Sequence, residues 1–181
     1  MNKLRKALII SVSVMTVFSM SMIAVPFQVE AASAGDLIKI DGYAPVYYLG
    51  DDDKRYVFPN ESTYFSWYPD FSSVVTLGQE EVEGYPLAAN VVVRPGTKLV
   101  KRPVPTDPKV YAVEPGGGLR HVSDEATAVG LYGDMWAKRV VDVADSFFVN
   151  YSINANEVTS DTYPAGSLVK YEGSADVYYI N

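Results

Sequence analysis

The stretch "DLIKIDGYAPVYYLGDDDKRYVFPN" (Asp36–Asn60) decides the fold, because it contains three short β-prone runs and a strong turn signal. The runs "VYYL" and "RYVF" are β-branched and aromatic, and they flank "GDDDK". Such runs around a Gly/Asp-rich turn predict a β-hairpin. The run "LIK" that precedes them predicts one more strand.

The same order of runs starts again twice further along the chain. The spacings between the "LIK"-type runs are 62 and 69 residues. A period above 50 residues is longer than most solenoid repeats, so we expect each copy to be a small unit in its own right. The matching runs are Leu37–Lys39, Leu99–Lys101 and Leu168–Lys170, and Val46–Leu49, Val110–Val113 and Val177–Ile180.

The second hairpin strand aligns "RYVF" with "RHVS", which places His121 at the position of Tyr56. In this copy "EPGGG" (Glu114–Gly118) fills the place of the acidic turn. Glycine permits the positive φ that such turns need.

The stretch after each hairpin predicts a short helix. Asn60 and Ser123 are favourable N-cap residues, and acidic residues follow both in the first turn. Pro69 and Gly133 are expected to end these helices.

The runs "VVTL" and "VVDV" then predict return strands at Val74–Leu77 and Val140–Val143. The segment "FFVNYSI" (Phe147–Ile153) predicts a further strand.

The predicted fold is therefore α+β and strand-dominated, with two tandem copies of a hairpin–short helix–strand unit plus a partial third copy. The expected bounds are 32–96, 97–165 and 166–181, and the copies could form one compact domain. The third copy lacks a hairpin partner, a helix and a return strand. Either its strands complete a sheet begun earlier or the chain is cut from a longer repeat protein. We favour the first, because an isolated strand pair is marginal in water.

Composition excludes several partners. The chain has 181 residues, a net charge of −7 and a pI near 4.7. An acidic chain disfavours nucleic acid, which needs clustered Lys and Arg, and it disfavours docking on an anionic membrane. The absence of cysteine excludes disulfides and thiol chemistry.

The first 31 residues are typical of a secretory signal peptide. A basic start is followed by an apolar run at Ala7–Val25, and small residues precede a cut between Ala31 and Ala32. Cleavage changes the net charge from −7 to −9. The expected location is secreted or cell-surface, without membrane contact after cleavage. The alternative is an N-terminal membrane anchor, since the apolar run nearly spans a bilayer.

No motif predicts a reaction. His121 is the single histidine, and its place on a strand at the position of a tyrosine favours packing. Asp51–Asp53 lacks the spaced ligand pattern of a calcium loop, so it predicts a solvated turn. "QEEVEG" (Gln79–Gly84) has no counterpart with the same carboxylate spacing in the second copy, so it predicts a solvated face. We expect no catalytic residue, no cofactor and no metal.

Aromatic residues are the remaining candidates for a binding site. The chain has 14 Tyr, 7 Phe and 2 Trp, and these rings pack either in the core or on a surface that stacks against sugars. The candidate stacking residues are Tyr47, Tyr64, Trp67, Tyr68, Tyr111, Tyr132 and Trp136.

The run "KRYVFPNESTYFSWYPDFSSV" (Lys54–Val74), with "RPGTKLVK" and "KVYAVEPGGGLRHV", resembles a tandem repeat of secreted bacterial cell-surface proteins. This resemblance covers nearly all of Asp36–Lys170. It implies a surface location and a non-enzymatic role, and it carries no known catalytic or binding residues. The chain is only loosely similar to the S-layer homology module, whose charged motif is absent.

Three functions are open. The first is a non-catalytic secreted or cell-surface structural or interaction module, whose partner is a cell-wall glycan or another surface protein. The second is a carbohydrate- or peptidoglycan-binding module that uses exposed aromatic rings. The third is a hydrolase with two converging carboxylates.

Overall fold

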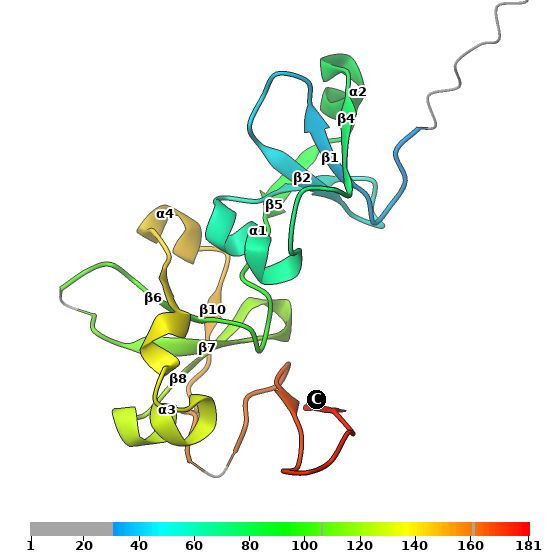
Figure 1. Ribbon diagram of the computed structural model, residues 1–181. Coiled ribbons are helices and arrows are strands. Elements are labelled where there is room, and N and C mark those ends of the chain that lie inside the picture. The colour runs from blue at the N-terminus through cyan, green and yellow to red at the C-terminus, as the bar shows by residue number, and fades with distance from the viewer. Residues whose placement is uncertain (1–30, 106, 161) are drawn as a thin grey trace, which may run out of the picture. The chain divides into compact units, whose positions relative to one another are not determined.

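The computed structural model describes residues 31–105, 107–160 and 162–181 (Figure 1). From Ala32 to Asn181 the chain forms one compact unit. Strands outnumber helices among the described residues, which confirms the expected strand-dominated α+β class. The predicted signal segment lies outside the described residues, apart from Ala31. No helix in the described ranges combines the length and the apolar character needed to cross a bilayer.

The first sheet has five strands in the order β4-β1-β2-β3-β5. Its three central strands are antiparallel, and each outer strand pairs parallel to its neighbour. The elements are β1 (Leu37–Ile40), β2 (Val46–Leu49), β3 (Arg55–Val57), α1 (Glu61–Trp67), β4 (Val74–Leu77), α2 (Gln79–Gly84) and β5 (Leu87–Asn90).

The second sheet also has five strands, in the order β10-β8-β7-β6-β9, with the same directions at each position. The elements are β6 (Leu99–Lys101), β7 (Val110–Glu114), η1 (Pro115–Gly117), β8 (Gly118–His121), α3 (Glu125–Tyr132), η2 (Trp136–Arg139), β9 (Val140–Asp142), α4 (Asp145–Phe148) and β10 (Ser152–Ile153). The two sheets thus share one topology, while duplication of a single ancestral unit stays a prediction.

Side-chain alternation along the strands gives the first sheet two buried faces. Leu37 packs with Val46 and with Tyr64 of α1 on one face. Ile38, the next residue, packs with Val82 of α2 on the other face. Each face of this sheet is therefore covered by one helix.

The second sheet follows the same rule. Leu99 packs with Ala112 and with Ala128 of α3. On the opposite face, Val100 belongs to a cluster against which Phe148 of α4 packs. The short helices thus cover the two faces of this sheet.

The ladder corrects the predicted alignment of the second hairpin strand by one residue. Leu49 lies opposite Arg55, and Val113 lies opposite Leu119. His121 therefore corresponds to Val57, and the predicted match with Tyr56 is wrong. A shift of one residue moves a side chain to the other face of a sheet, so this correction changes the surroundings expected for His121.

The same shift corrects one helix cap. Asn60 caps α1 as predicted, because its Oδ1 accepts a hydrogen bond of 2.8 Å from the backbone N–H of Thr63. The predicted cap at Ser123 is wrong: Asp124 caps α3 and accepts a bond of 2.7 Å from the N–H of Thr127.

One segment is helical where the sequence predicted a strand, and a second helix was not predicted. Residues 145–148 form α4, and only Ser152–Ile153 of the predicted strand 147–153 is extended. Gln79–Gly84 forms α2, whose Val82 is buried. Helices of 4 and 6 residues are too short to show a 3.6-residue period in the sequence.

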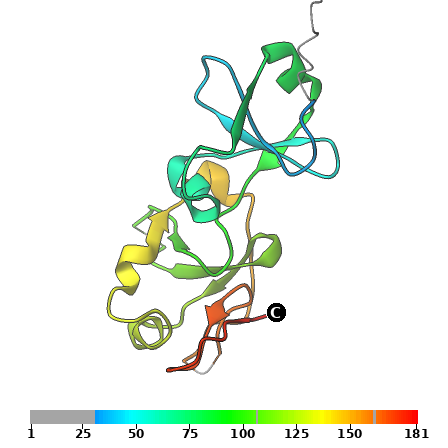
Figure 2. The ribbon, with the colours of Figure 1, turned by 45° about the vertical axis from the view of Figure 1, so that its right-hand side comes forward.

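The C-terminal hairpin consists of β11 (Leu168–Val169) and β12 (Tyr178–Tyr179), which pair antiparallel (Figure 2). Within the described part of the chain these strands form a separate two-stranded sheet. The expectation that they complete an earlier sheet is therefore wrong. Instead, Gly166 lies against the turn at Pro95–Gly96, so closely that a side chain at Gly96 would collide with the Gly166 carbonyl.

Removal of the α1 cap should destabilise the fold. We expect Asn60→Ala to lower the free energy of unfolding by about 1 kcal/mol, because the N–H of Thr63 loses its acceptor. Urea unfolding followed by circular dichroism measures the change. Asn60→Asp is the matched control and should retain most of the stability; equal losses in both variants would contradict the capping role.

The α3 cap should make stability depend on pH. Hydrogen bonds from the backbone N–H and the hydroxyl of Thr127 hold the pKa of Asp124 below its usual value. A lowered folded-state pKa stabilises the protein above the unfolded value of about 3.9, and this contribution is lost as pH falls through the folded pKa. Asp124→Asn should therefore lose less stability than wild type between pH 5 and pH 2, measured by urea unfolding. Parallel pH profiles for the two proteins would contradict this.

Candidate functional site

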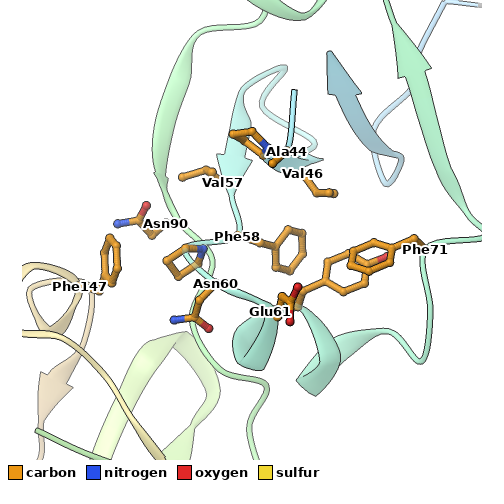
Figure 3. Close-up of a pocket in the computed structure, with 12 residues that line it drawn as sticks. Ala44, Val46, Val57, Phe58, Asn60, Glu61, Phe71, Asn90 and Phe147 are labelled. Carbon is orange, nitrogen blue, oxygen red and sulfur yellow. The ribbon is translucent and has the colours of Figure 1, made fainter. Parts of the chain in front are cut away.

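The first candidate site is the Phe58 cleft, a hollow of about 490 Å³ (Figure 3). The first hairpin, the start of α1, the end of β5 and α4 all contribute to it. Its lining residues are Ala44, Pro45, Val46, Val57, Phe58, Pro59, Asn60, Glu61, Tyr64, Phe71, Asn90 and Phe147.

Aromatic packing sets the shape of the Phe58 cleft. The ring of Phe58 meets Tyr64 edge-on with a centroid distance of 5.1 Å. Tyr64 stacks on Phe71 at 4.4 Å, and its hydroxyl donates a 2.7 Å bond to the carbonyl of Asp70. Tyr64 is buried and Phe71 is half exposed, so the outer ring of this stack reaches the surface.

The polar groups of the Phe58 cleft are few. Asn60 uses its Oδ1 for the α1 cap, and the side chain of Asn90 has no hydrogen bond among the described residues. Glu61 is the only carboxylate in the lining. This composition, mainly apolar with a few orienting polar groups, is typical of small-molecule sites.

The second candidate site is the tyrosine groove, a hollow of about 450 Å³. It shares Phe58 and Asn90 with the Phe58 cleft, so the two hollows are adjacent. Rings of β2, β3 and α1 dominate it. The lining residues are Tyr48, Tyr56, Phe58, Trp67, Tyr68, Asn90, Val91 and Val92.

Hydrogen bonds fix two rings of the tyrosine groove. The Trp67 Nε1–H donates a 2.8 Å bond to the carbonyl of Val92. The Tyr56 hydroxyl donates a 2.9 Å bond to Asp52 Oδ2, and this bond raises the pKa of Tyr56. Burial raises the pKa of Tyr68 as well, so the hydroxyl groups of Tyr56 and Tyr68 are both neutral at physiological pH. The groove therefore presents uncharged, pre-oriented rings.

The seven predicted stacking residues do not form one surface. Trp67 and Tyr68 line the tyrosine groove. Tyr64 and Tyr111 are core residues, with 2% and 3% of their surface exposed; Tyr64 lines the inner wall of the Phe58 cleft, and Tyr111 lines neither hollow.

The other three predicted rings pack on the sheets. Tyr47 lies under the guanidinium of Arg55, 5.0 Å from its ring centroid. Tyr132 and Trp136 pack against the cluster under α3, and burial raises the pKa of Tyr132 to about 12.

Three site residues were not predicted from the sequence: Tyr48, Tyr56 and Phe58. Tyr48 and Tyr56 are direct cross-strand partners, so they share one face of the sheet. Once the hairpin register is fixed by its turn, this pairing can be read from "VYYLGDDDKRYVF".

His121 lies in a smaller hollow of about 270 Å³, together with Asp124 and Glu125. Its Nδ1 is 2.8 Å from Glu157 Oε1, and its ring lies 5.8 Å from that of Tyr111. Because Asp124 is held ionised by the α3 cap, it is poorly suited to donate a proton.

The Asp51–Asp53 turn is exposed. Asp52 forms an ion pair with Lys54 and accepts a hydrogen bond from the Tyr56 hydroxyl. Over the described ranges, no cluster of three or more His, Cys, Asp or Glu side chains suits a metal ion.

Comparison with known proteins returned no matching family model, no matching curated protein and no matching solved structure. The resemblance to bacterial surface repeats therefore stays an expectation from the residues quoted above.

The Trp67 hydrogen bond should be needed to hold α1 against the segment after β5. Trp67→Phe leaves the Val92 carbonyl without its donor, and we expect it to lower the free energy of unfolding by about 1–3 kcal/mol. Trp136→Phe is the matched control, since no hydrogen bond of its indole N–H is present in the described part of the chain. Urea unfolding of the two variants measures the difference; a larger loss in Trp136→Phe would refute this role.

Proposed function

We propose that this protein is a non-catalytic interaction module, secreted or displayed on a cell surface, that binds its ligand in the tyrosine groove and the Phe58 cleft. The observation that carries the proposal is the pair of adjacent hollows of about 450 and 490 Å³, lined mainly by aromatic and aliphatic side chains. Both volumes lie in the range of ordinary ligand sites.

The chemistry of the lining favours binding over catalysis. Glycoside hydrolysis uses two carboxyl groups that face one bond, and Glu61 is the only acid in the two linings. The rings of Tyr48, Tyr56 and Tyr68 supply contact area and hydroxyl groups, but no nucleophile activated by a base.

A carbohydrate is the ligand class that the tyrosine groove favours. Tyrosine and tryptophan combine a large apolar face with a polar edge, which suits the alternation of C–H and hydroxyl groups on a sugar ring. Trp67 is held in place by its bond to Val92, so its ring pays little rotamer entropy on binding.

Loss of a groove ring should weaken binding. We expect Tyr68→Ala and Tyr56→Ala each to reduce retention on insoluble peptidoglycan about tenfold, since removing one well-packed ring costs a binding site about 1.4 kcal/mol or more. Two variants are used because Tyr68 also packs against the core, so its loss affects stability as well. Tyr56 lies on β3, and its hydroxyl donates a hydrogen bond to the exposed carboxylate of Asp52.

Tyr171→Ala is the matched control, because Tyr171 is highly exposed and lines neither hollow. Circular dichroism shows that each variant is folded. In a Trp136→Phe background, Trp67 is the sole tryptophan and its fluorescence reports ligand in the groove. Retention unchanged in both groove variants, or hydrolysis of the peptidoglycan by the wild-type protein, would overturn the proposal.

A further inference from the structure

A third hollow, the Arg94 hollow, lies beside the tyrosine groove and shares Trp67 and Val92 with it. Its volume is about 520 Å³. The Phe58 cleft, the tyrosine groove and the Arg94 hollow are therefore neighbours in a row. The lining residues of the Arg94 hollow are Trp67, Val92, Arg94, Pro95, Gly96, Thr97, Pro115, Gly116, Gly166, Leu168 and Tyr179.

The backbone holds Arg94 at a fixed place in this hollow. Its N–H donates a 2.9 Å bond to Ser66 Oγ, and its carbonyl accepts a 2.7 Å bond from Thr97 Oγ1. The guanidinium lies over the Trp67 ring, 5.8 Å from the centroid.

The charge of Arg94 is not neutralised within the described residues. No carboxylate there pairs with it, and its guanidinium makes no hydrogen bond. By contrast, Arg102 bonds Asp145 at 2.8 Å and Arg120 bonds Glu114 at 3.2 Å. In a chain with 22 acidic and 15 basic residues, an exposed arginine beside the Trp67 ring, without a carboxylate partner among the described residues, is available to an external anion.

The C-terminal hairpin supplies another wall of the Arg94 hollow. Tyr179 of β12 is 54% exposed and Leu168 of β11 is 66% exposed, and both line it. The hollow thus offers an apolar ring face and a guanidinium to the same ligand.

We propose that the three hollows bind a linear acidic glycan, a chain of sugar rings that carry carboxylates, with Arg94 as the residue that selects the charge. This inference rests on the proposed binding function and names its ligand class. Three adjacent hollows suit several consecutive sugar units rather than one. The aromatic rings contact the sugar faces, and the planar guanidinium bonds one carboxylate through two N–H groups.

A glycan fits the tyrosine groove better than an acidic peptide does. One common way in which an extended peptide binds is to add a strand to an unpaired sheet edge. The groove rings stand on β2 and β3, and each of these strands is already paired on both sides. Side chains, not free backbone groups, therefore form the contact surface of the groove.

The test compares acidic chains with the same chains made neutral. The probes are four-unit oligomers of galacturonate and of glucuronate, and the same oligomers with their carboxylates methyl-esterified. Titration calorimetry with the full chain gives each affinity. We expect tighter binding of the acidic oligomers and a loss of that preference in 1 M NaCl, because salt screens an exposed ion pair.

Arg94→Gln should lower affinity for the acidic oligomers about tenfold and leave the esterified oligomers unchanged. Arg139→Gln is the matched control, because it removes the same charge elsewhere on the protein. Arg139 is exposed on η2 and lines none of the three hollows. Equal effects of the two variants would show that only net charge matters and would overturn the role of Arg94.

The remaining outcomes separate this inference from the proposed function. If both forms of the oligomers bind equally, and Tyr56→Ala weakens both, the groove binds glycans but the acidic class is wrong. If neither oligomer binds and a tetraglutamate peptide does, the glycan is wrong and the ligand is an acidic peptide. If no probe binds but peptidoglycan retention still depends on Tyr56, the inference fails while the proposed function stands.

Discussion

Both sheets depend on one constraint: a small sheet with two apolar faces must have a cover on each. Leu37 and Ile38 are neighbours in the chain and point to opposite sides, and each is almost fully buried. The same holds for Leu99 and Val100. The order of elements follows from this requirement, since the helix between β3 and β4 covers one face and the helix between β4 and β5 covers the other. The outer strands return parallel to their neighbours because a crossover with a helix separates them.

The candidate site is a consequence of the same arrangement. Tyr64 is used to fill the core under α1, and the rings next to it, Phe58 and Phe71, are left at the margin of the helix. Trp67 ends α1 and is tied to Val92, in the segment that leads from the first sheet to the second. The hollows therefore lie where a short helix stops covering its sheet, so the hollows and the core share the same aromatic residues.

The sequence predicts the hairpins and the return strands well, since β-branched runs and Gly/Asp turns have direct physical causes. It fails for α2 and α4, because a helix of one or two turns has no period to detect. The predicted alignment of "RHVS" with "RYVF" is also wrong by one residue. It matched Arg120 with Arg55, whereas the strand registers match Arg55 with Leu119. Trp67 and Tyr68 of the candidate site were predicted. The sequence could not distinguish them from the buried rings of Tyr64 and Tyr111, because side-chain exposure depends on how the helix packs on the sheet.

The C-terminal hairpin differs from the two five-stranded sheets in how far its apolar residues are buried. Leu168 occupies the place of Leu37 and Leu99 in its own ladder, opposite Tyr179 as Leu37 is opposite Tyr48. Leu168 is 66% exposed, whereas Leu37 and Leu99 are 3% and 1% exposed. In the two five-stranded sheets a helix and an outer strand pack against the corresponding leucine, whereas no third strand pairs with β11 or β12 among the described residues. The turn at Gly166, with φ of 91°, matches Gly35, with φ of 96°, so the hairpin forms from local signals while its apolar face stays open. The exposed side chains of Leu168 and Tyr179 therefore line the Arg94 hollow instead of a covered sheet face.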